Sequence, residues 1–163
     1  MTRLSTLRLT SRTLLLSASA LAIASVPAQA ADVLFSTTGV TEVAPGQRVM
    51  LGTGVLQLRL DNGATLSFVE GAEFTLNADG TLDLHKGSVT VAGAGDAETL
   101  VRMPEGVEGR VGGTGNAASF RVRDDGESDG HTLSGSSTIT RGRTSRDFAA
   151  GQMWESSGRS GIR

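Results

Sequence analysis

The stretch of this chain that comes nearest to a metal site is Asp125-Gly126-Glu127-Ser128-Asp129-Gly130. It places carboxylates at alternate positions before a glycine, as the first half of a calcium-binding loop does, and Ca²⁺ prefers several oxygen ligands on a tight turn. The EF-hand pattern also needs a glutamate at its twelfth position, which here is Ser136. A polar hairpin loop with Asp-Gly turn chemistry accounts for the same residues. We therefore predict no bound metal, and a calcium loop at residues 125–130 remains the alternative.

The residue types needed for catalysis are sparse. His85 and His131 are the two histidines, the chain has no cysteine, and a zinc site normally takes three or four ligands. No serine sits in a Gly-x-Ser-x-Gly elbow or in a recognisable triad setting. The run Gly112-Gly113-Thr114-Gly115 lacks the lysine of a phosphate loop and is typical of a turn. The sequence therefore predicts no enzyme, no catalytic residue and no cofactor.

Trp154 is the sole tryptophan, and it follows Gly151-Gln152-Met153. In a small β domain a single tryptophan most often caps the core, because its large apolar ring gains most from burial. The alternative is an exposed anchor for a protein partner or a sugar. We predict the structural role, with the ring partly buried.

Residues 1–30 are predicted to be a secretory signal peptide. Arg3, Arg8 and Arg12 form a basic start without an acid, an apolar run follows, and Ala28-Gln29-Ala30 supplies small residues at the −3 and −1 positions. The apolar run is shorter than the ~20 residues of a spanning helix and is interrupted by serines. We expect cleavage after this site, export to the periplasm or the medium, and no transmembrane segment afterwards. A retained membrane anchor is the alternative.

Without that segment the chain is mildly acidic. The whole sequence has 15 basic and 17 acidic residues, and beyond residue 30 there remain 12 basic and 17 acidic residues, a net charge of −5. Binding to nucleic acid or to an anionic membrane needs a positive surface, so we expect neither. The lack of cysteine excludes a disulfide framework. The remaining length suits one domain, which we place at residues 31–155, followed by a flexible Ser- and Gly-rich tail at residues 156–163.

Apolar and polar residues alternate through residues 46–91, a period that is typical of half-buried strands. Asn62-Gly63 and Asp79-Gly80 supply the positive φ angles that tight hairpins need, and Lys86-Gly87 indicates a further break. We therefore predict an all-β fold in which every second residue of a strand faces the core. The side chains predicted to face the core are those of Leu58, Leu66, Phe68, Leu82 and Leu84, whereas Arg59, Thr65 and Asp83 point outward.

The second half of the chain also predicts short strands. Two segments that begin at Leu66 and Leu82 repeat the same apolar and glycine positions, which indicates strand-turn units stacked on a common face. We therefore expect a single domain of mainly antiparallel strands, in a sandwich or a roll with solenoid-like strand-turn repeats. The later strands are expected at residues 107–111 and 120–122 and near Leu133, Ile139 and Phe148, with turns at Asp124-Asp125-Gly126 and Ser128-Asp129-Gly130.

Several short glycine-containing runs occur in a recognisable order. The first half contains Gly46-Gln47-Arg48-Val49, Gly52-Thr53-Gly54, Leu58-Arg59-Leu60-Asp61-Asn62-Gly63-Ala64-Thr65-Leu66 and Gly87-Ser88-Val89-Thr90-Val91. The second half contains Pro104-Glu105-Gly106, Val111-Gly112-Gly113-Thr114 and Gly151-Gln152. This order resembles the periplasmic domain of the FecR family. Two departures are the late position of Phe120 and the run Ser134-Gly135-Ser136-Ser137-Thr138-Ile139, where the family has Glu-Gly-x-Val.

The resemblance covers nearly all of the mature chain and implies a sensing or adaptor module of the Gram-negative envelope. Well-known members also have a cytoplasmic segment that controls a sigma factor and a transmembrane helix. Here only twelve residues precede the apolar run, so direct sigma-factor control is not expected. We expect a non-catalytic exported domain that binds another envelope protein, with an unpaired edge strand as a physical route. The alternative is a binding module for an envelope polysaccharide or a small ligand.

Overall fold

The computed structural model describes residues 31–158 and 161–163, so the predicted signal peptide, residues 1–30, lies outside the described residues. The described helical content is one 3-10 turn, η1 (Pro104–Gly106), and no described helix is long and apolar enough to cross a membrane. The strands are β1 (Asp32–Ser36), β2 (Arg48–Met50), β3 (Leu56–Arg59), β4 (Thr65–Phe68), β5 (Glu73–Leu76), β6 (Leu82–Ala92), β7 (Glu98–Met103), β8 (Val107–Gly112), β9 (Ala117–Val122), β10 (Ser128–Ser134), β11 (Ser136–Arg141), β12 (Thr144–Ala149), β13 (Met153–Ser157) and β14 (Gly161–Ile162).

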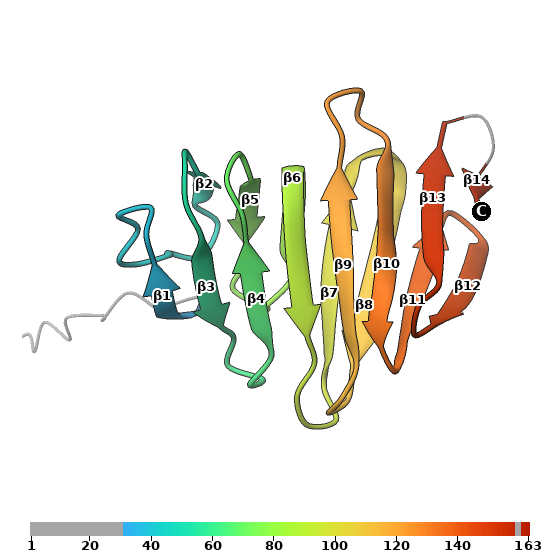
Figure 1. The fold of residues 1–163 in the computed structure, drawn as a ribbon, viewed down its shortest axis with the longest axis horizontal. Coiled ribbons are helices and arrows are strands. Elements are labelled where there is room, and N and C mark those ends of the chain that lie inside the picture. The colour runs from blue at the N-terminus through green and yellow to red at the C-terminus, as the bar shows by residue number, and fades with distance from the viewer. Residues whose placement is uncertain (1–30, 159–160) are drawn as a thin grey trace, which may run out of the picture.

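The strands form two layers that face each other (Figure 1). The first layer has the order β1-β3-β4-β6-β9-β10-β13-β14, and the second has the order β2-β5-β6-β7-β8-β11-β12. Paired strands are antiparallel except β6 and β7, which are parallel. The hairpin turns use glycine where φ is positive, as at Gly63 (φ 84°) and Gly80 (φ 80°). The all-β fold with mainly antiparallel strands is thus confirmed.

Strand β6 belongs to both layers. Its first half pairs with β5 and β7 in the second layer, and its second half pairs with β4 and β9 in the first layer. The strand passes between the layers at Gly87, where φ is 78° and a side-chain Cβ would lie 2.7 Å from the Cα of Ala72. The prediction of a strand break at Lys86-Gly87 is therefore wrong. Gly87 instead lets one continuous strand pass from one layer to the other, because only a residue without a Cβ atom fits at this position.

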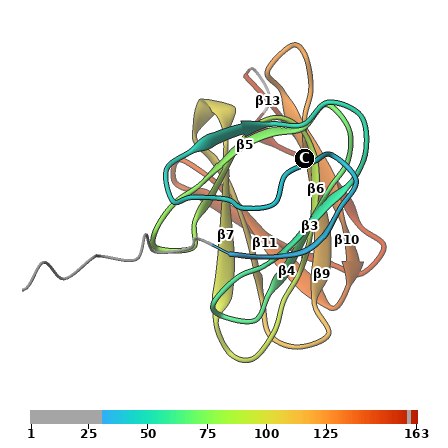
Figure 2. The same cartoon turned by 90° about the vertical axis from the view of Figure 1, so that its left-hand side faces the viewer.

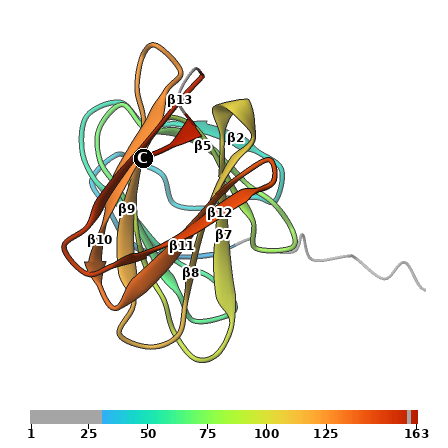
Figure 3. The same cartoon turned by 90° about the vertical axis from the view of Figure 1, so that its right-hand side faces the viewer.

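The two ends of the layered structure differ. At the β1 end, Ala31 of the first layer forms an antiparallel bridge with Val43, which precedes β2 of the second layer. This end faces the viewer in Figure 2, where the chain runs around the interior. At the other end, β12 pairs with β11 and β14 pairs with β13, and no strand pairing joins β12 to β14 in the described chain (Figure 3). The fold is a flattened roll that is closed at one end and left with free edge strands at the other.

The core lies between the layers and follows the predicted parity. Each of the five predicted core residues is at most 1% exposed; they are Leu58, Leu66, Phe68, Leu82 and Leu84. Arg59 is exposed, and Thr65 and Asp83 are half-buried on the outer faces. The rings of Phe68 and Phe74 stack with their centroids 4.0 Å apart. Because side chains alternate faces along a strand, this agreement confirms the predicted buried faces of β3, β4 and β6.

The predicted flexible tail at residues 156–163 needs correction. Ser156 and Ser157 are the last residues of β13, and they pair with Ile162 and Gly161 of β14. Ile162 is buried, at 4% exposure, so its hydrophobic side chain holds β14 against the core. The turn predicted at Ser128-Asp129-Gly130 is also wrong, because these residues begin β10.

Candidate functional site

The acidic segment at residues 125–130 runs from the turn between β9 and β10 into the first residues of β10. The turn closes through two backbone bonds, from Arg123 N–H to Glu127 O (2.9 Å) and from Gly126 N–H to Arg123 O (3.0 Å). The Asp125 carboxylate accepts a third bond from Glu127 N–H, at 3.0 Å. Asp-Gly turn chemistry therefore accounts for the start of the segment, as the sequence predicts. Its second half is extended strand rather than loop.

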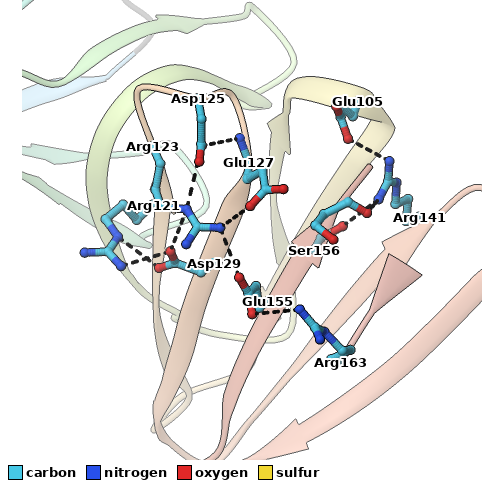
Figure 4. A network of polar contacts seen from close by, with 11 residues as sticks. Glu105, Arg121, Arg123, Asp125, Glu127, Asp129, Arg141, Glu155, Ser156 and Arg163 are labelled. Carbon is cyan, nitrogen blue, oxygen red and sulfur yellow. Dashed lines mark hydrogen bonds and ion pairs between the residues drawn. The ribbon is translucent and has the colours of Figure 1, made fainter. Parts of the chain in front are cut away.

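The acids of this segment lie against arginines (Figure 4). Asp129 accepts two hydrogen bonds of 2.9 Å from Arg121, and this pairing raises the pKa of Arg121. Glu127 accepts a bond of 2.5 Å from Arg123, whose Nε is 3.8 Å from Asp125. Glu155 links Arg123 (3.1 Å) to Arg163 (3.3 Å), and its hydrogen bond is the main cause of the raised pKa of Arg123. A cation at this turn would have to compete with these guanidinium groups for the same oxygens.

Neither histidine lies in a cluster that could hold a metal. His85 is on the second layer, where its Nε2 lies 3.0 Å from the Thr75 hydroxyl. His131 is on β10 of the first layer, opposite the exposed Met153 of β13. Within residues 31–158 and 161–163, no group of three or more His, Asp or Glu side chains is placed to hold a metal ion. The Gly112-to-Gly115 run connects β8 and β9 as the predicted turn.

Trp154 is buried in the core, at 2% exposure. Its ring lies against Phe120, with centroids 6.1 Å apart and planes tilted by 50°. Gly130 makes room for it, because a Cβ at Gly130 would lie 2.9 Å from the indole Cζ2 atom. The predicted structural role is confirmed, and burial goes further than predicted. An exposed aromatic anchor at this position is therefore wrong.

Two shallow hollows lie on the outer face of β9, β10 and β13, with volumes of about 350 and about 280 Å³. Arg121, Asp129 and Met153 line both of them. Arg121 and Asp129 already bind each other through two hydrogen bonds. The charged pair that lines both hollows is thus engaged within the chain.

An exposed apolar group lies at the β1 end of the first layer. Its members are 39% to 54% exposed and comprise Leu34, Phe35, Val55 and Val69. The pairing of β1 with β3 shifts register between Val33 and Phe35, which marks a bulge at Leu34. A bulge turns consecutive side chains toward one face of a sheet and interrupts an edge for further pairing. This end is therefore a poor template for an added strand.

Strand β12 is the longest free edge in the described chain. It pairs with β11 through six consecutive residues without a bulge, and its first four residues, Thr144 to Asp147, are exposed. The other edge strands are the bulged β1, the three-residue β2 and the two-residue β14. A long, regular and unpaired edge presents backbone N–H and C=O groups that another strand can pair with.

The backbone pattern shows which donors β12 leaves free. Ala150 N–H donates to Gly135 O (2.9 Å), and in an antiparallel pair the inward-pointing N–H groups alternate along the strand. The N–H groups of Ser145 and Asp147 therefore point away from β11. Ala149 N–H points the same way, and it donates to Oε1 of Gln152 at 2.6 Å. Gln152 thus ends the free edge, and the donors of Ser145 and Asp147 remain for a partner.

Arg141 holds this edge in position. Its guanidinium donates to Glu105 Oε2 (2.7 Å) on η1, and to Ser156 Oγ (3.2 Å) and the Ser157 carbonyl on β13 (Figure 4). Arg141 is the last residue of β11, so these bonds connect the second layer to the first beside β12. Glu105 has a φ of 58°, a left-handed conformation that is uncommon for residues other than glycine. The strand that β12 pairs with is therefore tied to η1 and to β13.

β12 was not predicted as a binding edge from the sequence. One signal was present: Thr144-Ser145-Arg146-Asp147 is a polar run without alternation that directly precedes Phe148. A strand that is polar on both faces is typical of an edge. That pattern indicates that residues 144–147 lie in an edge strand, but it does not show which strand they pair with.

Comparison with known proteins gives similarity at the level of fold. No family model matches the chain, and no curated protein matches it in sequence. Two crystal structures of a protein from Parabacteroides distasonis ATCC 8503, named a "putative anti-sigma factor", are similar in fold, at 1.65 and 2.50 Å resolution. Each has a TM-score of 0.60 and 12% sequence identity over 72% of this chain. The similarity spans 58% of the length of that protein, and at this identity it concerns the fold alone.

Proposed function

We propose that this chain is an exported, non-catalytic, FecR-like domain that acts as a protein-interaction or sensing module in signalling or assembly of the Gram-negative envelope. The signal-peptide pattern of residues 1–30 supports export to the periplasm or the medium. The similarity in fold to a protein named an anti-sigma factor supports a regulatory role. The arginine-bound acids at residues 125–129 and the separated histidines support a role without catalysis.

The free edge of β12 is the observation that carries this proposal. It offers two outward N–H groups on a regular strand, held in place by Arg141. A partner that adds a strand gains main-chain hydrogen bonds without needing a deep pocket. The partner is another envelope protein with an extended segment.

The alternative of a polysaccharide or small-ligand module has lost one of its two supports. It rested on the Gly-rich loops and on Trp154 as an aromatic platform, and the ring of Trp154 is buried. A base or sugar ring stacks on an exposed aromatic face, so a buried indole cannot serve as the platform.

Site-specific photocrosslinking in the envelope fraction tests the proposal. A photoreactive residue at Thr144, on the free edge, is compared with one at Arg59, an equally exposed position on β3. We expect a discrete adduct with one envelope protein from position 144 only, and the purified partner should bind the mature chain. Equal adducts from both positions, or a purified adduct protein that does not bind, would contradict the proposed function.

A further inference from the structure

We propose that the segment received by β12 is an extended strand with acidic residues placed to meet Arg143 and Arg146. This inference rests on the proposed function and adds the chemistry of the partner. The ion pairs of the described residues support that chemistry. Each lysine and arginine of residues 31–158 and 161–163 lies in an ion pair with an acid of the same chain, with three exceptions. The exceptions are Arg59, Arg143 and Arg146.

Two of these three exceptions flank the free edge. Arg146 lies within the exposed part of β12, and Arg143 directly precedes the strand. The nearby Asp147 accepts a hydrogen bond of 2.7 Å from the Thr138 hydroxyl, and Arg141 is neutralised by Glu105. The edge is therefore locally positive on a mature chain whose net charge is −5. Charge complementarity steers a partner of opposite charge to such a site.

The alternation of β12 fixes where the acids must lie. Arg146 shares the parity of Phe148, which is buried, so its side chain leaves the strand on the inner face. Arg143 belongs to the hairpin turn that directly precedes β12. On an antiparallel partner, the residue opposite Arg146 meets its guanidinium group, and a residue three positions later lies beside Arg143. The residue opposite Asp147 must not be acidic, because like charges placed directly opposite each other repel.

A second copy of this chain fits the edge less well. Antiparallel pairing of two β12 strands centred on Arg146 would place two guanidinium groups opposite each other, and pairing centred on Asp147 would do the same with two carboxylates. Pairing centred on Ser145 avoids both conflicts and brings Asp147 toward Arg143 of the copy, but it leaves Arg146 opposite Thr144, without an acid. An acidic strand from another protein has neither conflict and supplies an acid to Arg146 as well.

A synthetic peptide tests this inference directly. The probe is the labelled, acetylated peptide Thr-Val-Thr-Glu-Val-Thr-Glu-Val, whose two glutamates have the required spacing; its control has glutamine in place of both. Binding to the mature chain is measured by fluorescence anisotropy at low salt, where exposed charge pairs are least screened. We expect the Glu peptide to bind and the Gln peptide to bind about tenfold more weakly, as for two exposed ion pairs.

Protein variants give the matched comparison. The double substitution Arg143→Gln and Arg146→Gln should weaken binding of the Glu peptide about tenfold and remove the difference between the peptides. Arg59→Gln, at the third unpaired arginine, should leave binding unchanged. Ser145→Pro, which removes an outward N–H, should abolish binding of both peptides.

The outcomes separate this inference from the proposed function. Equal binding of the Glu and Gln peptides, with both lost in Ser145→Pro, overturns the acidic partner and keeps strand addition. Binding of the Glu peptide that survives Ser145→Pro overturns strand addition at this edge. If neither peptide binds, the inference of an acidic partner strand is wrong. The crosslinking experiment at Thr144 still tests the proposed function in that case. A mature chain that dimerises through β12 makes a second copy the occupant and also overturns the inference.

Discussion

Ala149 donates its backbone N–H to the side-chain Oε1 of Gln152 at 2.6 Å, and this contact ends the free edge of β12. Gln152 is placed by the turn that follows the strand, in which its own N–H donates to the Ala149 carbonyl (3.0 Å). The Gln152 side chain thus accepts a hydrogen bond from a backbone N–H group that would otherwise be free for a partner strand. The exposed donors that remain, on Ser145 and Asp147, define the length of partner strand that β12 can pair with.

Amide hydrogen exchange along β12 should alternate. The N–H groups of Arg146 and Phe148 point toward β11 and should exchange slowly, whereas those of Ser145 and Asp147 face solvent and should exchange fast. Ala149 should be protected in the wild type and become fast in Gln152→Ala, which removes the acceptor. Residue-resolved exchange by NMR measures this pattern. Uniform protection from 144 to 149 would mean that the edge is already covered.

Replacing Phe68 with Ala should destabilise the domain by ~3–5 kcal/mol, because the ring is fully buried and stacks on Phe74. Such a loss is a large part of the total stability of a small domain. Urea unfolding followed by circular dichroism gives the free energy. Arg59→Ala is the control, since Arg59 is exposed and unpaired, and it should change stability by less than ~0.5 kcal/mol. Comparable losses for both variants would contradict the assignment of faces.

Glycine substitutions test the strand crossing. Gly46 and Gly87 have nearly the same φ, 74° and 78°, but nothing lies within 4 Å of a Cβ at Gly46. Gly46→Ala should therefore cost only the left-handed strain of about 1 kcal/mol. Gly87→Ala should cost a further ~1–3 kcal/mol, because its Cβ meets the backbone of Ala72. Equal losses in urea unfolding would show that β6 does not pass so close to Ala72.

Acid should weaken the turn that leads into β6. The hydrogen bond from Thr81 N–H (2.9 Å), and then the Thr81 hydroxyl, lower the pKa of the Asp79 carboxyl. Because the pKa of Asp79 is lower in the folded chain than in the unfolded chain, the ionised carboxylate stabilises the fold at pH values above the unfolded pKa of ~4. This stabilisation is lost as the pH falls from there through the pKa of the folded chain. Asp79→Asn keeps the accepting oxygen and removes the titration. The melting temperature of the wild type should thus fall more than that of Asp79→Asn below pH ~4, and parallel profiles would contradict this role.

The first half of the fold could be predicted from the sequence because local pattern and global structure agree there. The alternation through Leu58, Leu66 and Phe68 identifies the buried face, and the pairs at Gly63 and Gly80 identify hairpin turns. Gly87 was assigned wrongly because a turn and a crossing both need positive φ. The deciding contact, with Ala72, is between residues that the pattern alone does not bring together.

The candidate site could not be predicted in the same way. Whether β12 is an edge depends on the order of strands in the layer, and alternation gives no information about order. The burial of Trp154 depends on the missing side chain of Gly130 on the neighbouring strand, which the sequence marked as a turn. The strand at Gly161–Ile162 was missed because its Ser- and Gly-rich surroundings indicate flexibility, while one buried isoleucine holds it.

The most direct measurement is the yield of the envelope adduct from a photoreactive residue at Thr144 in two backgrounds, Ser145→Ala and Ser145→Pro. Both remove the hydroxyl, but only proline removes the outward N–H, and proline is tolerated on an edge strand where that N–H faces solvent. Melting temperatures close to the wild type confirm that both variants fold. Strand addition at β12 predicts a wild-type yield in Ser145→Ala and loss of the adduct in Ser145→Pro. An adduct that persists in a folded Ser145→Pro variant would contradict it.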